Sequence, residues 1–203
     1  MKIFSFLAML HLSLMLGWGV ARVYAFGTEP HAIATDRPDT SGRRWFERIK
    51  PYCNSVEVLT AVRRTPPPEH RDSPGYQAAC YALAGKISEA DDLLAGLPDD
   101  RADHAAGIVF DVGHPVADAG DDDSAGPIMR LVVKYQPRNF MALYHSGISS
   151  YNLGDLALAR AHLKRFLALY DREDGWRRNG LTVLARIERG ERGNVFSGQL
   201  GNE

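Results

Sequence analysis

The second half of the chain arranges apolar and polar positions with the spacing of an α-helix. Two such stripes follow each other, one over residues 142–151 and one over residues 158–167. Apolar residues three and four apart share one face of a helix, so each stripe predicts an amphipathic helix. Between the stripes lies Leu153-Gly154-Asp155, and glycine readily takes the left-handed conformation that ends a helix. The pattern predicts two antiparallel helices joined by a tight turn.

This helical pair is repeated along the chain. Four residues recur 34 positions later in the same order, with Gly113, Gly120, Asp121 and Ala125 corresponding to Gly147, Gly154, Asp155 and Ala159. An earlier copy spans residues 76–98, where Gly85 and Ala90 precede their counterparts by 35 positions. A fixed period in this range is typical of stacked helical hairpins. We therefore expect an all-α array of three to four hairpins over residues 41–189.

The two ends of the array are less regular. The first unit is degenerate: residues 43–50 keep Trp45, Phe46 and Ile49 on one apolar face, and prolines at 66–68 break the chain after its second half. At the other end, residues 174–189 begin with a capping aspartate and carry Trp176, Leu181, Leu184 and Ile187 as one stripe. This stripe predicts a C-terminal capping helix with a polar outer face. Residues 190–203 are glycine-rich and polar, which predicts a flexible tail.

Small residues indicate where the paired helices cross. Gly147 lies inside a predicted helix, where glycine costs about 1 kcal/mol relative to alanine, so we expect close approach of the facing helix at Ala159. Gly113 and Ala125 repeat this pairing in the preceding unit. That unit also carries Pro115 within its first helix, which predicts a kinked or shortened helix because proline removes a backbone donor.

These residues resemble the tetratricopeptide repeat family, whose 34-residue unit has small residues at the helix crossing, Gly-Asp in the turn and often a proline between units. The resemblance covers roughly residues 71–171, with Pro137 in the proline position, and residues 36–69 only weakly. Ser150 stands where the family prefers an aromatic residue, and Asp171 where it prefers proline. The resemblance implies a right-handed superhelical solenoid that binds other proteins without catalysing a reaction.

The resemblance also implies which residues line the concave groove. Carried onto this chain, the groove positions are Phe110, His114, Asp118, Met141, Tyr144, Ile148, Tyr151 and Asn152. Tyrosine offers a large contact area with a polar tip, so a peptide or a helix of a partner protein would fit this surface. In a short array, the alternative is that Tyr144 and Tyr151 pack against a neighbouring unit or the C-terminal helix.

The N-terminus predicts export. Lys2 precedes a mostly apolar stretch over residues 3–21, and Val23-Tyr24-Ala25 fits the small-residue cleavage pattern of a secretory signal. We expect a signal peptide at 1–25 and a linker at 26–40, which gives a periplasmic or secreted protein with no membrane insertion after cleavage. An uncleaved membrane anchor remains the alternative, because the apolar stretch approaches the ~20 residues that span a bilayer.

The two cysteines, Cys53 and Cys80, both lie in the exported part. An even count outside the reducing cytosol makes a disulfide the leading interpretation, ahead of two buried thiols. The repeat register places Cys53 early in the second helix of the first unit and Cys80 in the first helix of the next. A bond between them would join the weakest unit to the stronger array.

Charge and motifs indicate little chemistry. The formal net charge is −1, and −3 without Lys2 and Arg22, so there is no electrostatic footprint for nucleic acid. His114, Asp118 and the aspartates at 121–123 would suit a metal site, but no calcium-loop ladder or zinc-protease motif accompanies them. We therefore favour helix capping for the acidic run, and expect no catalytic residue, no metal ligand and no cofactor.

Three functions stay open at this stage, with the oligomeric state undetermined. The leading one is an exported protein-interaction module. The second is a structural subunit of a larger envelope complex. The third, least favoured, is a metal-dependent hydrolase using His114 and the acidic run.

Overall fold

The computed structural model describes residues 42–193, and the predicted signal peptide, the linker and the tail from residue 194 lie outside this range. The described residues form helices and no strand, which confirms the all-α prediction. The helices are α2 (Gly42–Ile49), the 3₁₀ helix η1 (Lys50–Tyr52), α3 (Val58–Arg64), α4 (Ser73–Leu83), α5 (Ile87–Ala95), α6 (Asp99–Asp118), α7 (Asp122–Tyr135), α8 (Phe140–Asn152), α9 (Leu156–Leu169) and α10 (Gly175–Glu188).

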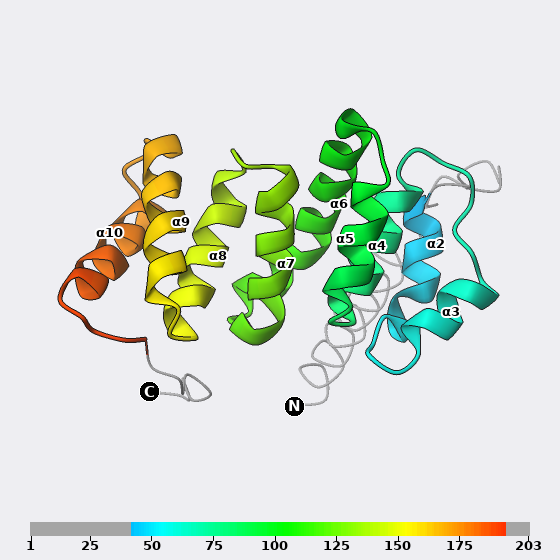
Figure 1. The fold of residues 1–203 in the computed structure, drawn as a ribbon, viewed down its shortest axis with the longest axis horizontal. Helices are drawn as coiled ribbons and strands as arrows, with labels where there is room; N and C mark the ends of the chain where they lie inside the picture. The colour runs from blue at the N-terminus through cyan, green and yellow to red at the C-terminus, as the bar shows by residue number, and fades with distance from the viewer. Residues whose placement is uncertain (1–41, 194–203) are drawn as a thin grey trace, which may run out of the picture. The chain divides into compact units, whose positions relative to one another are not determined.

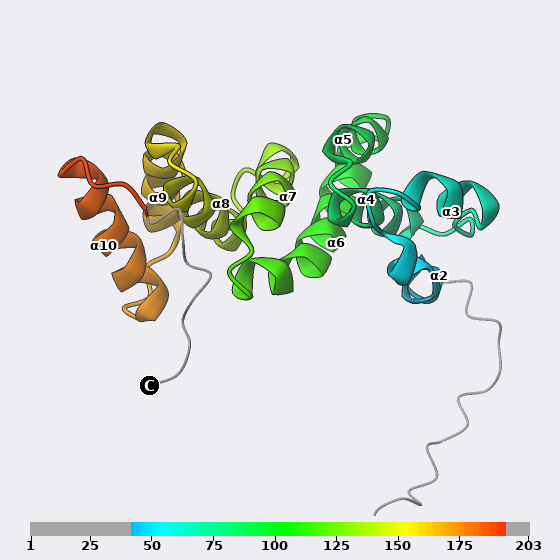
Figure 2. The same ribbon diagram turned by 90° about the horizontal axis from the view of Figure 1, so that it is seen from below.

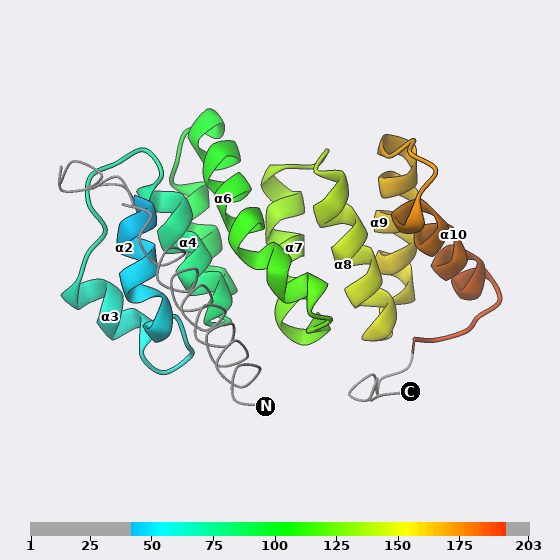
Figure 3. The same ribbon diagram turned by 180° about the vertical axis from the view of Figure 1, so that it is seen from behind.

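From α4 onward the two helices of each pair, α4 and α5, α6 and α7, and α8 and α9, pack against each other, and α4 also packs extensively against α6 (Figure 1). α4, α6 and α8 lie along one side, and α5, α7 and α9 along the other (Figure 2). Contacts between α4 and α6, α6 and α8, and α8 and α10 join the helices of the first side, which faces the viewer in Figure 3. Residues 30 or more apart in sequence are thereby brought together on one surface.

The turns between paired helices use glycine in the left-handed conformation. Gly85, Gly120 and Gly154 have φ angles of 71°, 76° and 88°, and each stands between the two helices of a pair. In the last two turns the next residue caps the following helix: Asp121 accepts a hydrogen bond from Ser124 N at 3.2 Å and Asp155 from Leu158 N at 3.0 Å. The predicted Gly-Asp turns are confirmed.

Both predicted helix crossings rely on glycine, but the contacting residue differs from the prediction. A Cβ atom on Gly147 would lie 2.7 Å from Leu163 Cγ, and one on Gly113 would lie 2.6 Å from Ile128 Cγ2. Leu163 and Ile128 stand about one turn beyond the predicted alanines. The buried side chains of Leu163 and Ile128 occupy the space that a Cβ atom would need. These side chains, rather than the alanines, are the reason that glycine is required at the two crossings.

Replacing Gly147 with alanine is expected to destabilise the protein by up to about 2 kcal/mol. Overpacking typically costs 1–3 kcal/mol, and improved helix propensity returns about 1. Gly107→Ala in α6 is the control, because there a Cβ would meet only the flexible end of Gln136 at 3.3 Å. Urea unfolding measures both changes. Equal stability of the two variants would contradict the close approach at Leu163.

Of the two expectations for Pro115, a kinked or a shortened helix, the shortening is wrong. Pro115 lies within the helix, which continues to Asp118, so the proline does not shorten it. Proline lacks a backbone N–H and leaves the carbonyl of Asp111, four residues earlier, without its usual helical donor. The last turn of α6 is retained, and it carries His114 and Asp118 on the same face.

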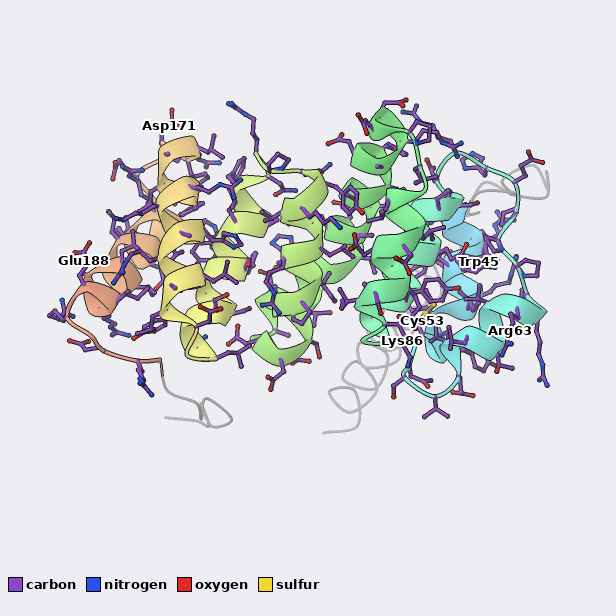
Figure 4. The ribbon with its side chains drawn as sticks, viewed as in Figure 1. Trp45, Cys53, Arg63, Lys86, Asp171 and Glu188 are labelled. Carbon is purple, nitrogen blue, oxygen red and sulfur yellow. A yellow bond between two sulfur atoms is a disulfide. The ribbon has the colours of Figure 1, made fainter. Side chains whose placement is uncertain are left out.

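A disulfide joins the first unit to the array, and a buried tryptophan connects α2 with the end of α3 inside that unit. Cys53 and Cys80 are bonded, with Cα atoms 4.9 Å apart, as the leading interpretation predicted. Cys53 does not lie within a second helix, because it follows η1 and precedes the turn into α3. Trp45, 1% exposed, donates from Nε1 to the carbonyl of Thr65 at 2.7 Å. Figure 4 labels Trp45 and Cys53 in this region.

The predicted C-terminal helix exists as α10, and Asp174 caps it by accepting from Trp176 N and Arg177 N. It packs on α9 and α8. Leu184 and Ile187 are buried as predicted, but Trp176 and Leu181 are 38% and 48% exposed. The predicted apolar stripe of α10 therefore included two residues that are not buried, because packing on α8 and α9 covers only part of the helix. Beyond α10, Gly193 is buried, and a Cβ there would lie 2.6 Å from the carbonyl oxygen of Tyr151.

Candidate functional site

Helix α6 places three of the predicted groove residues on one face. Phe110, His114 and Asp118 are each four residues apart, so they lie above one another along the helix. The rings of Phe110 and His114 stack with centroids 4.9 Å apart. Phe110 and His114 are half-buried, and Asp118 is exposed. This face of α6 meets α8 through its histidine.

The centre of the site is a contact between two histidines. His114 Nε2 of α6 lies 3.0 Å from His145 Nε2 of α8. Asp118 Oδ1 lies 3.6 Å from each of these nitrogens. One carboxylate oxygen and two imidazole nitrogens thus lie close together, and this is the one group of three or more potential metal ligands found within residues 42–193.

His145 is enclosed by aromatic rings. Its side chain is 6% exposed, and its ring meets those of Tyr144 and Trp176 edge-on, at centroid distances of 5.2 and 5.7 Å. Burial, and secondarily the neighbouring His114, lower the pKa of His145 to about 4, against the opposing effect of Asp118 and Asp122. The ring is therefore neutral at neutral pH and offers a lone pair or a single N–H.

Two of the predicted groove residues do not line an open groove. Tyr144 and Tyr151 are 6% and 5% exposed. Tyr144 contacts the rings of Phe166 and Trp176 at 5.1 and 5.0 Å, and its hydroxyl accepts from Asn179 Nδ2 at 2.6 Å. The packing of α9 and α10 against α8 covers Tyr144, which matches the alternative that this residue packs against the C-terminal helix.

The other predicted residues of α8 remain partly accessible. Met141, Ile148 and Asn152 are half-buried, and the first two pack against the core with one side. Asn152 is engaged with the acidic turn: its Nδ2 donates to Asp122 Oδ2 at 2.6 Å, and Ser149 Oγ donates to Asp122 Oδ1 at 2.8 Å. Asp122 thus ties the start of α7 to the end of α8, while Asp121 has the predicted capping role.

The sequence interpretation missed three residues of the site. It gave no role to His145 or Asn179, and it assigned Trp176 to the apolar stripe of the capping helix. The available hint for His145 was its place in the repeat: it lies next to Tyr144, a predicted groove position. Trp176 became part of the site because α10 packs on α8 and leaves the indole at the surface beside His145.

In comparisons with known proteins, no family model, no curated protein and no solved structure matched this chain. Within residues 42–193, no helix combines the length and apolar character needed to cross a membrane.

Proposed function

We propose that this protein is an exported, non-catalytic interaction module that holds a peptide or helix of a partner protein against α6, α8 and α10. In this proposal the helices form a tetratricopeptide-like, right-handed solenoid of hairpins. Two features support the repeat. Positive-φ glycines recur at positions 85, 120 and 154, and helices two apart in the chain are in contact: α4 with α6, α6 with α8, α8 with α10, and α5 with α7. Such stacking is how hairpin repeats build a continuous surface.

One observation carries the binding role: an aromatic row crosses three helices. The row consists of Phe110, His114, His145 and Trp176, which contact one another in that order from α6 through α8 to α10. Its ends are accessible, with Trp176 38% exposed and Phe110 half-buried. Aromatic side chains that are anchored on one side and open on the other are typical of interface hot spots.

The disulfide supports the proposed location. Bonds such as Cys53–Cys80 persist in oxidising compartments and are rare in the cytosol of mesophiles. The predicted secretory signal at 1–25 has the same implication. Together they favour a periplasmic or secreted protein.

The binding proposal is tested with Trp176→Ala, after circular dichroism confirms folding. A partner is captured by crosslinking in the native compartment, identified, purified and titrated against both proteins. Loss of the indole is expected to weaken binding at least tenfold, about 1.4 kcal/mol. Leu181→Ala is the control, because Leu181 is a similarly exposed apolar residue of α10. It follows Trp176 by five positions and therefore lies on a different face of the helix. Equal affinity of wild type and Trp176→Ala would contradict the proposal.

A second candidate is a structural subunit of a larger envelope complex, favoured by the surface near α3. Three large apolar residues are exposed there, Tyr52 at 49%, Val56 at 85% and Leu59 at 40%. A cavity of about 560 Å³ lies beside them, lined by residues that include Ile49 and Ala61. If this surface packs permanently on another subunit, Val56→Asp will release the protein from the complex in native gels while Trp176→Ala will not.

A further inference from the structure

The three polar atoms of the histidine–aspartate group are spaced as metal ligands are. The triangle formed by His114 Nε2, His145 Nε2 and Asp118 Oδ1 has sides of 3.0, 3.6 and 3.6 Å, so its centre lies about 2.0 Å from each atom. Zn–N and Zn–O bonds in proteins are about 2.0–2.2 Å long. An ion at or just above this centre would lie within bonding distance of all three atoms and would replace the present His114–His145 hydrogen bond.

The ligands are held by rigid elements. His114 and Asp118 stand one helical turn apart on α6, and His145 lies on α8. Stacking by Phe110 fixes one face of the His114 ring, while Tyr144 and Trp176 contact the ring of His145. Preorganised ligands lose little conformational entropy on binding, which favours a specific site over casual association.

The chemistry of the group selects the kind of ion. Two imidazole nitrogens and one carboxylate oxygen suit zinc and other divalent transition metals, whereas calcium and magnesium prefer ligand sets made of oxygen alone. The acidic turn supplies negative charge: Asp118 and Asp122 both act electrostatically on His145. Asp122 already accepts from Ser149 and Asn152 and contributes charge only.

The group is open on one side. The side chain of Asp118 is 50% exposed and that of His114 30%, whereas that of His145 is 6% exposed. A metal held here has protein ligands below it and solvent above. Three protein ligands with an open fourth position are the arrangement in which zinc also binds water or a group from another molecule.

We propose that His114, Asp118 and His145 form a binding site for a divalent transition metal ion, zinc being the ion that fits best, with a fourth coordination position open to solvent. The site goes beyond the proposed interaction function and does not depend on it.

Isothermal titration calorimetry of the full chain with zinc chloride tests the site. The protein carries no affinity tag, because tag histidines bind zinc, and is first stripped with EDTA. We expect one zinc ion per chain with a Kd of about 1 μM or tighter. Asp118→Asn, an exposed and nearly isosteric change, and His114→Asn are each expected to weaken binding at least tenfold. Co²⁺ in place of zinc gives an independent readout, since its visible spectrum reports nitrogen and oxygen coordination.

Two matched variants separate this site from other polar groups. Asp123→Asn removes a charge from the same acidic run without touching the group, and His104→Asn removes a different histidine–aspartate pair, in which His104 Nε2 lies 2.7 Å from Asp72 Oδ1. Both are expected to leave the Kd unchanged. The proposal is overturned if the wild type shows no saturable binding tighter than about 1 mM, or if Asp118→Asn and His114→Asn bind zinc as the wild type does.

Discussion

Replacing both cysteines with alanine is expected to lower the free energy of unfolding by about 2–4 kcal/mol. The bond joins residues 27 apart in sequence, and its loss restores conformational freedom to that loop in the unfolded chain. Alanine is preferred to serine because Cys80 is fully buried and Cys53 is 8% exposed, so that serine would add an unpaired hydroxyl. In the folded protein, the first unit would then be held to α4 by packing of α2, which includes the stacked rings of Phe46 and Tyr76.

The loss of stability is expected to affect the first unit before it affects the rest of the array. Helices in a stacked array depend on their immediate neighbours, and α3 makes few contacts with α4. Hydrogen exchange should therefore show amides of residues 42–65 losing protection in the variant, while those of α8 and α9 keep it. Wild-type protein treated with a reducing agent is the control for the mutations themselves. Uniform loss of protection, or no loss, would contradict the view that the disulfide mainly stabilises the first unit.

The fold was predictable where its signals are local. The turn at Gly154-Asp155 is encoded by two adjacent residues, one with a positive φ and one that caps the next helix, and this pair recurs at Gly120-Asp121. The burial of Trp45, Phe46 and Ile49 also followed from helical spacing alone. The close helix contact at Gly147 was predicted, but the contacting residue was not. That residue depends on the relative axial position of the two helices, which no local pattern specifies.

The candidate site was harder to predict because it is tertiary. His114 and Asp118 share a helix face and were recognised together, but His145 joins them only through the packing of α6 on α8, 31 residues away in sequence. Tyr144 was assigned to a groove from its repeat position, without knowledge of where α10 lies. The position of α10 explains why Tyr144 is covered and why Trp176 is accessible. Asn179 of α10 donates a hydrogen bond to the Tyr144 hydroxyl, and Trp176 lies beside His145.

Phe166→Ala is expected to destabilise the protein by about 3–5 kcal/mol, the usual cost of removing a buried phenylalanine. Phe166 is fully buried in α9 and contacts the rings of Tyr144 and Tyr170 at 5.1 and 5.0 Å. It also supports α10, because a Cβ on Gly180 would lie 3.1 Å from Phe166 Cε1. Truncation leaves a cavity where α8, α9 and α10 meet.

Urea unfolding gives the stability change, and hydrogen exchange shows where it acts. We expect the amides of α10 to lose protection first, since α10 has neighbours on one side of the array only. Phe140→Ala is the matched control: the ring of Phe140 also contacts Tyr170, at 5.2 Å, but is 40% exposed, so its loss should cost less than about 1 kcal/mol. If the two variants are equally stable, Phe166 is not the residue that holds α10 against α8, and the position of Trp176 beside His145 must have another support.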